Sequence, residues 1–315
     1  MEQAAAENLN TRRIMPLSER RSASFDLALA LVPVLICGIW TYGAPALREI
    51  FLSVFACVFA QWLYRYFMKK PLELSDGTAV ATGLLLACLL PPAVPVYVPL
   101  LGGAFAQIIV VELFGGYGNQ FISPALAARG FLLVSFSTVM SYNAAAQITL
   151  KTPLDVMLAG GTVDMAELFI CRGVGPIGEI SALCILVGFI YLLVRRRADF
   201  IVPVVGTAVF AVVLGVFGGH GFDLNYIGTM VLGTGFLFLT CFFASDTHYT
   251  PVRPGAKAVF GAVYGALYAI YMMLSNGTDN GTYALMFCML LTPLMDIFLN
   301  GQKKKKITDD AKEED

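Results

Sequence analysis

The side chains that could carry chemistry are few, and each interrupts a sequence that is otherwise very apolar. Arg129 lies in the middle of the apolar run 121–140. Inserting an arginine into a membrane costs about 2.5 to 3.5 kcal/mol, so this side chain should face protein, water or an anion. Its guanidinium could hold the carbonyl groups of a broken helix, or a carboxylate of a cofactor or partner.

Carboxylates at the ends of apolar runs form a second group of candidates. Most groups of this kind are solvated helix caps, but ionisable groups close to membrane spans also mark ion pathways. The carboxylates in question are Asp76, Glu112, Glu179, Asp246 and Asp296. Some of them could handle a proton or a sodium ion, and Asp76 and Asp246 are our candidates for an ion path.

The longest polar interruption, at residues 142–178, contains two threonine hydroxyls, Thr149 and Thr152, with Pro153 directly after the second. A residue before proline is pushed to extended geometry, and threonine bonds to nearby backbone, so the pattern alone predicts a turn. Loops held between rigid helices often carry functional residues. This loop is therefore the first place to look for a site.

The composition predicts an integral membrane protein. Of the 315 residues, 57% are hydrophobic and 14% are charged, which is too apolar for a soluble protein of this length. The seven cysteines include no CxxC pair and lie mostly inside apolar runs, so we expect buried free thiols rather than disulfides or a zinc site. The glycine-rich turn at 115–119 lacks the lysine of a phosphate loop, and we expect neither a nucleotide site nor a nucleic-acid partner.

Ten apolar runs are candidates for membrane spans, because a span needs about 20 mostly apolar residues. They lie at about 25–42, 47–68, 77–90, 98–114, 121–140, 180–194, 200–217, 226–244, 258–274 and 283–299. The third and the sixth are short for a full crossing, which favours discontinuous helices that line a cavity. The expected fold is all-α, with ten transmembrane helices.

Basic residues are distributed unevenly between these runs. With the N-terminus inside, the outer segments contain only Arg48, Lys151 and Arg172. The positive-inside rule then places both termini in the cytoplasm and the Thr152 loop outside. The chain divides into an N-terminal tail (1–24), a first five-helix repeat (25–141), the outer loop (142–178), a second five-helix repeat (179–300) and a C-terminal tail (301–315).

A weak internal repeat supports this division. Thr82 and Gly83, followed by an apolar run, match Thr234 and Gly235. Each pair lies in the third span of a five-span half. An odd number of spans per half gives the halves opposite orientations, and sites then form at their interface near the middle of the membrane.

Four stretches, with a fifth near the end, together resemble the RnfD family. Its members are the D subunits of the Rnf-type ion-translocating ferredoxin:NAD oxidoreductase. The RnfD family is related to the NqrB subunits of the sodium-translocating NADH:quinone reductase. They read SDGTAVATGLLL (75–86), FGGYGNQFISPALAAR (114–129), GEISAL (178–183), FASDTHYTPV (243–252) and TPLMD (292–296). In order, they cover nearly the whole apolar region. The resemblance implies two inverted five-helix repeats, as in urea channels.

The resemblance also implies FMN joined by a phosphodiester to a threonine of an outward-facing motif, which maps to Thr152 with Thr149 as the upstream hydroxyl. The motif departs from the family's form, since Ala146 replaces an aspartate, Leu150 a small residue and Lys151 an alanine. Lys151 could instead offset the charge of the phosphate. A second, noncovalent riboflavin between the halves is a further implication.

Asn119, Arg129 and Glu179 are the residues we expect to line a flavin site. The resemblance implies an electron-transfer subunit in a bacterial or archaeal cytoplasmic membrane, in which flow from ferredoxin to NAD drives sodium or proton movement. Its partners would be the other subunits of the complex, among them an outer-side flavoprotein and iron–sulfur subunits, together with a flavin transferase and membrane lipid. A flavin-free scaffold and a small-solute channel on the same fold are the alternatives.

Overall fold

The computed structural model describes residues 17–71, 74–140, 156, 165–170, 175–219, 221–274 and 281–296. Thr149, Lys151 and Thr152 lie outside the described residues, as does the expected C-terminal tail 301–315. The expected N-terminal tail is helical in part, because the first described helix begins at Leu17.

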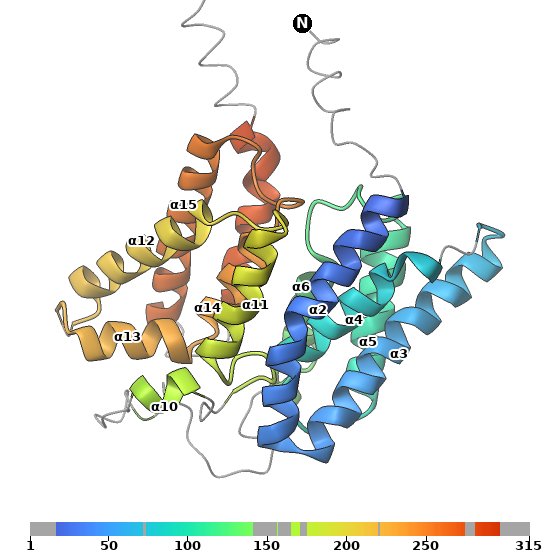
Figure 1. The fold of residues 1–315 in the computed structure, drawn as a ribbon, viewed down its shortest axis with the longest axis horizontal. Helices are drawn as coiled ribbons and strands as arrows, with labels where there is room; N and C mark the ends of the chain where they lie inside the picture. Colours follow the sequence, from blue (N-terminus) through green and yellow to red (C-terminus); the bar gives the residue numbers. More distant parts are fainter. Residues whose placement is uncertain are drawn as a thin grey trace, which may run out of the picture.

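Residues of the first half form a group of helices that lies on the right in Figure 1. These are α2 (Leu17–Tyr42), α3 (Ala44–Phe67), α4 (Thr78–Leu89), α5 (Tyr97–Ala104), the π-helix η2 (Phe105–Glu112), α6 (Pro124–Ser135) and α7 (Ser137–Met140). The 3-10 turn η1 (Leu74–Asp76) precedes α4. Pro124 begins α6, where its fixed φ and missing N–H suit the first turn of a helix.

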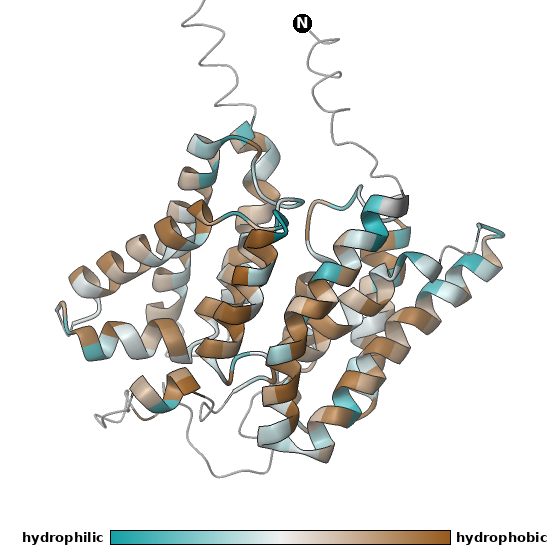
Figure 2. Ribbon diagram, in the orientation of Figure 1, coloured by the Kyte–Doolittle hydropathy of each residue, from teal (hydrophilic) through white to brown (hydrophobic). Residues whose placement is uncertain are grey.

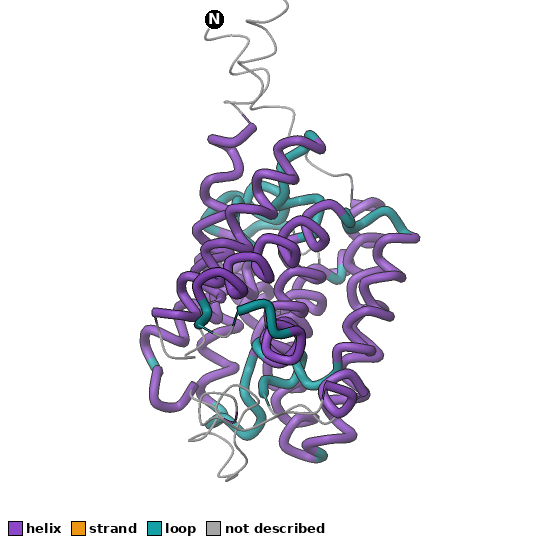
Figure 3. Tube along the Cα trace, turned by 90° about the vertical axis from the view of Figure 1, so that its left-hand side faces the viewer, coloured by secondary structure: helices purple, strands orange, loops and turns teal. Residues whose placement is uncertain are grey.

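Residues of the second half form the group on the left in Figure 1. These are α10 (Met165–Ile170), α11 (Ala182–Val194), α12 (Ile201–Phe217), α13 (Leu224–Gly233), α14 (Phe236–Leu239), the π-helix η3 (Thr240–Ala244), α15 (Pro254–Leu274) and the helix Gly281–Asp296. Figure 3 shows helices joined by loops, and no strand occurs in the described part of the chain.

Each of the ten predicted runs falls on an apolar helix or on a pair of consecutive helices. By length and composition, three helices could cross a membrane, namely Glu19–Tyr42, Ala44–Phe67 and Pro254–Leu274, or four if the bent pair Leu224–Gly233 and Phe236–Ala244 counts as one span. The third and sixth runs are short, as expected: α4 has 12 residues and α11 has 13. The two short helices and the bent pair agree with the prediction of discontinuous helices.

The surface of this bundle is apolar, as a membrane requires. Hydrophobic residues colour most of each helix in Figure 2, while hydrophilic ones gather mainly toward helix ends and connections. Large apolar side chains are exposed along α3 in particular, including Phe51, Phe55 and Phe59. Helices with exposed apolar faces are stable next to lipid tails, because contact of apolar side chains with lipid is favourable and contact with water is not.

The expectation of free cysteines is wrong for one residue. Cys37, on α2, forms a disulfide, while Cys57, Cys88, Cys184, Cys241 and Cys288 are free thiols. The partner of Cys37 lies outside the described residues. Sequence spacing could not reveal this bond, because a disulfide requires two sulfurs to meet in space and not in sequence.

The two groups of helices meet where α2 packs against α11. A Cβ atom built on Gly188 of α11 would collide with the backbone oxygen of Ala30 on α2. Gly188 therefore allows the two backbones to approach closely, which is the usual way in which membrane helices gain packing energy.

We expect Gly188→Ala to push α2 and α11 apart and to destabilise the protein by about 1 to 3 kcal/mol, the usual range for overpacking. Gly255→Ala is the matched control, because no atom lies within 4 Å of a Cβ built at that position of α15. Size-exclusion chromatography after heating would measure the apparent midpoint. Equal midpoints for the two variants would contradict this account of the interface.

Candidate functional site

A buried ion pair joins the two groups of helices. Nη1 of Arg129, on α6, lies 3.2 Å from Oε1 of Glu179, which precedes α11. The arginine side chain is fully buried and that of Glu179 is 8% exposed. The arginine therefore faces protein, as expected from the free-energy cost of placing an arginine in a membrane. Its partner is a carboxylate of this same chain.

The segment that carries Glu179 is fixed by backbone contacts with the first half. Gly178 N donates to Cys88 O at 2.7 Å and Ile177 N donates to Leu90 O at 3.2 Å, both at the end of α4. A Cβ on Gly178 would lie 2.7 Å from the Cβ of Cys88, so only glycine allows this approach. The backbone of Gly178 packs against the end of α4, and this contact fixes the position of the Glu179 carboxylate.

The Glu179 carboxylate also lies against the break between α13 and α14. Gly235, at this break, has a φ of 74°, in the left-handed region that favours glycine. A Cβ built there would collide with all three atoms of the Glu179 carboxyl group. The two helical segments meet at 58°, and the free backbone N–H groups at the start of the second segment favour a negative charge.

A second polar cluster surrounds Asp246. Its Oδ1 accepts a hydrogen bond from His248 N at 2.9 Å, and its backbone forms an isolated bridge with Ala198. A small cavity of about 30 Å³ lies here, and Tyr117, Arg197, Asp246 and His248 are among its lining residues. Burial raises the pKa of Asp246, although His248 and Arg197 partly offset this effect.

Asp76 and Asp246 lie close enough to act on the same side chain. Burial and the nearby carboxylates of Asp246 and Asp76 raise the pKa of the Tyr117 hydroxyl. Asp76 Oδ1 also accepts hydrogen bonds from the N–H and hydroxyl groups of Thr78, at 3.1 and 2.9 Å. Asp76 thus serves as a local cap of α4, the commoner role of such carboxylates, and also belongs to the Tyr117 cluster.

Asn119 does not join the Arg129–Glu179 pair. Its amide donates to Gly115 O at 3.4 Å within its own turn, and its side chain is exposed. In the described structure Arg129 and Glu179 thus contact each other and Asn119 does not contact them; that the three line a flavin site stays a prediction. A polar residue in a glycine-rich turn is more often a local hydrogen-bond partner than a ligand contact.

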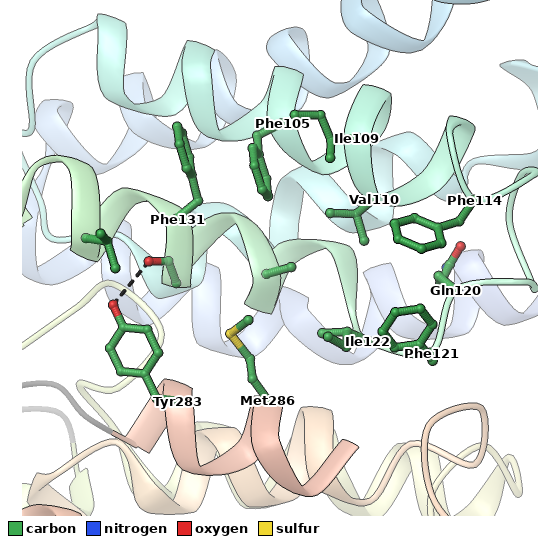
Figure 4. Close-up of a pocket in the computed structure, with 13 residues that line it drawn as sticks. Phe105, Ile109, Val110, Phe114, Gln120, Phe121, Ile122, Phe131, Tyr283 and Met286 are labelled. Carbon is green, nitrogen blue, oxygen red and sulfur yellow. Dashed lines mark hydrogen bonds between the residues drawn. The ribbon is translucent and has the colours of Figure 1, made fainter. Parts of the chain in front are cut away.

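An apolar cavity of about 450 Å³ lies between η2 and α6 on one side and the helix Gly281–Asp296 on the other. Figure 4 shows aromatic and aliphatic side chains around it, including the stacked rings of Phe105 and Phe131, 4.3 Å apart. Tyr283 closes one end through a hydrogen bond from its hydroxyl to Gly130 O at 3.1 Å. Sequence reasoning did not find this cavity, because its walls come from both halves.

Reasoning from sequence also missed the partner of Glu112. Arg65 Nε lies 2.6 Å from Glu112 Oε1, and Lys70 Nζ lies 3.4 Å from Oε2. A similar cluster joins the start of α2 to the end of α11, where Asp26 pairs with Arg195 and Arg197. Arg65 and Glu112 are 47 positions apart, and sequence spacing does not reveal such pairs.

These helices and their buried charges define an α-helical membrane protein with a polar contact between its two halves. The chain belongs to the NQR2, RnfD, RnfE family, whose profile matches residues 17–305. The resemblance noted in the sequence is thereby confirmed.

Relatives match the chain over most of its length. It is 33% identical over 286 residues to the D subunit of the Na(+)-translocating ferredoxin:NAD(+) oxidoreductase complex of Acetobacterium woodii, covering 87% of each chain. It is 27% identical over 299 residues to the proton-translocating counterpart of Clostridium ljungdahlii, covering 89% of this chain and 90% of the relative. Identity to the B subunit of the Na(+)-translocating NADH-quinone reductase of Klebsiella pneumoniae is 29% over 278 residues, covering 81% of this chain and 67% of the relative.

We expect Glu179→Gln to lower the thermal midpoint of the purified protein, because neutralising one partner of a buried ion pair costs about 3 to 5 kcal/mol. Glu19→Gln, which neutralises an exposed carboxylate of α2, should leave the midpoint unchanged. A dye that reacts with the buried thiols would report unfolding. The interpretation fails if the two variants unfold at the same temperature.

Asp246 should make the stability depend on pH. Because its pKa is higher in the folded protein than its ordinary value of 3.8, the folded state binds the proton more tightly. The stabilising contribution of Asp246 to the free energy of unfolding is therefore complete below pH 3.8. It is lost as the pH rises through the pKa of Asp246 in the folded protein. Asp246→Asn should remove this part of the pH profile while keeping the oxygen that accepts from His248. A variant with the wild-type profile would contradict the prediction.

Proposed function

We propose that this chain is the D subunit of an ion-translocating ferredoxin:NAD oxidoreductase complex and acts in electron transfer within that complex. The main support is the match to two named subunits of this type over at least 87% of the chain. In this role the polypeptide is not catalytic alone. It works with the other subunits, among them an outer-side flavoprotein and iron–sulfur subunits, in a bacterial or archaeal cytoplasmic membrane with both termini inside.

The proposed membrane arrangement is ten helices in two inverted five-helix repeats. Two observations support it: the predicted runs all coincide with apolar helices, and short or bent helices occur in the third position of each half, at α4 and at α13–α14. Discontinuous helices in corresponding positions of two halves are typical of inverted-repeat membrane proteins. The Arg129–Glu179 pair then lies at the interface between the repeats.

The proposed cofactor is FMN, attached through a phosphodiester to the Thr152 hydroxyl by a flavin transferase. When bound, a flavin supplies one-electron transfer, and the protein supplies position and electrostatics. Retention of Thr152, Pro153 and Leu154 supports the proposal. Lys151 adjoins the hydroxyl in sequence and would offset the negative charge of the phosphate.

The described residues offer a partial fit to a second, noncovalent flavin. The 450 Å³ cavity lies within the range of small-molecule sites and has stacked aromatic walls. Gln120 belongs to the lining, and its buried Oε1 has no hydrogen-bond partner in the described part of the chain. Gln120 would accept from a ring N–H, and Phe131 would stack on the ring; Arg129 and Glu179 do not line this cavity.

The FMN attachment can be tested by mass. Intact-protein mass spectrometry of the chain, expressed with its flavin transferase, should show an increment of one FMN that is absent from Thr152→Ala and retained in Thr149→Ala. In-gel fluorescence should change in the same way. If the wild type shows no increment while the transferase modifies another subunit, the Thr152 assignment is wrong. A flavin-free scaffold, or a small-solute channel on the same fold, would then explain the departures at Ala146 and Leu150.

A further inference from the structure

Cys37 differs from the other cysteines that the structure describes, because its sulfur is not a free thiol. It lies on α2, is 6% exposed and forms a disulfide. The chain contains seven cysteines. Those with free thiols are Cys57, Cys88, Cys184, Cys241 and Cys288. The count leaves Cys171, which lies outside the described residues, as the remaining cysteine of the chain.

The described residues on the two sides of Cys171 in the sequence are both held by hydrogen bonds. Ile170 O, at the end of α10, accepts a hydrogen bond from Ser181 Oγ at 2.9 Å. The hydroxyl of Tyr42 donates to Gly175 O at 2.7 Å and accepts from Gly175 N at 3.1 Å. Tyr42 is the last residue of α2. One of these two anchoring points therefore lies at the end of the helix that carries Cys37.

The chain between the anchoring point and Cys171 is long enough for the two sulfurs to meet. Cys171 precedes Gly175 by four positions, and four extended residues span at most about 14 Å. Cys37 precedes Tyr42 by five positions on the same helix, a rise of about 7.5 Å. The Cα atoms of a disulfide lie about 4.4 to 6.8 Å apart. A bond between the two cysteines thus requires no displacement of α2.

The segment that follows Cys171 also packs directly beside Cys37. Gly38 is the next residue of α2, and a Cβ built there would lie 2.6 Å from Cγ2 of Ile177 and 3.2 Å from its backbone oxygen. Only a residue without a side chain allows this approach. The segment 175–179 therefore passes over α2 next to the cysteine.

We propose that Cys37 and Cys171 form a disulfide within the chain, and that this bond fixes the segment 175–179 to α2 on the outer side of the membrane. The segment ends in Glu179, the partner of Arg129, so the bond joins the two halves of the bundle covalently where the ion pair joins them electrostatically. It also holds the end of the outer loop that contains Thr152, 19 positions before Cys171. The proposal depends on neither a flavin nor electron transfer.

Proximity to this segment does not by itself decide which cysteine is bonded. A Cβ built on Gly178 would lie 2.7 Å from the Cβ of Cys88, yet Cys88 is a free thiol. The assignment therefore rests on the disulfide of Cys37 and on the five free thiols, and the packing of the segment agrees with it.

The bond is consistent with an outer position of this end of α2. Disulfides persist in oxidising compartments and are rare in the cytosol, and the distribution of basic residues independently places the loop outside. Formation of the bond oxidises two thiols to one disulfide and transfers two electrons and two protons to an oxidant. A disulfide-bearing protein on the outer side would accept them by thiol–disulfide exchange, and its own disulfide would become two thiols.

The bond acts as a structural tie and not as a redox switch. Labile, regulatory disulfides are exposed or strained, whereas Cys37 is buried and the adjacent Gly38 is covered by Ile177. Its role is therefore to restrict the positions that the segment 175–179 takes relative to α2.

Counting thiols tests the pairing directly. Membranes that contain the full-length chain are denatured without reductant and alkylated at once with iodoacetamide. The chain should gain five groups, and seven if it is reduced first. Proteolysis of the unreduced sample should yield a cross-linked pair of peptides that contains Cys37 and Cys171. Alkylation of Cys171 in the unreduced sample, or a Cys37 peptide linked to another polypeptide, would overturn the proposal.

A double-mutant cycle tests the structural role. Cys37→Ser and Cys171→Ser should each lower the thermal midpoint of the purified chain by roughly 5 °C or more. The double variant should lose no more than either single variant, because one bond is removed in all three. Cys184→Ser, at a half-buried free thiol, is the control and should lose less than half as much. An unchanged midpoint in Cys171→Ser, or losses that add in the double variant, would contradict the proposed tie.

Discussion

A charge inside a membrane has no water to solvate it, and the Arg129–Glu179 pair is where the fold of this chain depends most on that constraint. The guanidinium is fully buried, so it must be met by a carboxylate held in a fixed position. Replacing such a pair by apolar residues is often neutral, but removing one partner is costly. The pair therefore stabilises the packing of the two halves of the chain against each other.

Much of the surrounding structure serves to deliver Glu179 to this position. Gly178 allows the loop to lie on the end of α4, and Gly235 leaves room for the carboxyl group at the break in the bent helix. Tyr42 anchors the start of the same segment, since its hydroxyl contacts both the N–H and the carbonyl of Gly175. Glycine is needed at two of these positions because a Cβ would occupy the space that backbone or carboxylate uses.

The same constraint explains why polar residues in the described structure gather in a few places. Glu112 pairs with Arg65 and Lys70, and Asp26 pairs with Arg195 and Arg197. Along α3, Glu49 Oε2, Ser53 Oγ and Gln61 Oε1 are buried without a hydrogen-bond partner among the described residues. Between these places the helices pack through apolar side chains, and the 450 Å³ cavity has mostly apolar walls.

The positions of the helices could be predicted from sequence, because hydrophobic runs are a local property and a membrane demands them. Family membership and the burial of Arg129 followed in the same way from local motifs and from the cost of a charge in lipid. Tertiary structure alone decided that Arg129 meets Glu179, 50 positions away, and that Asn119 does not join them. It also decided the Cys37 disulfide and the π-helical turns of η2, whose Gln107 lies beside Cys57 and whose Glu112 pairs with Arg65. Pairings of this kind depend on how closely segments that are far apart in the sequence approach one another in space. Sequence spacing does not determine that spatial distance.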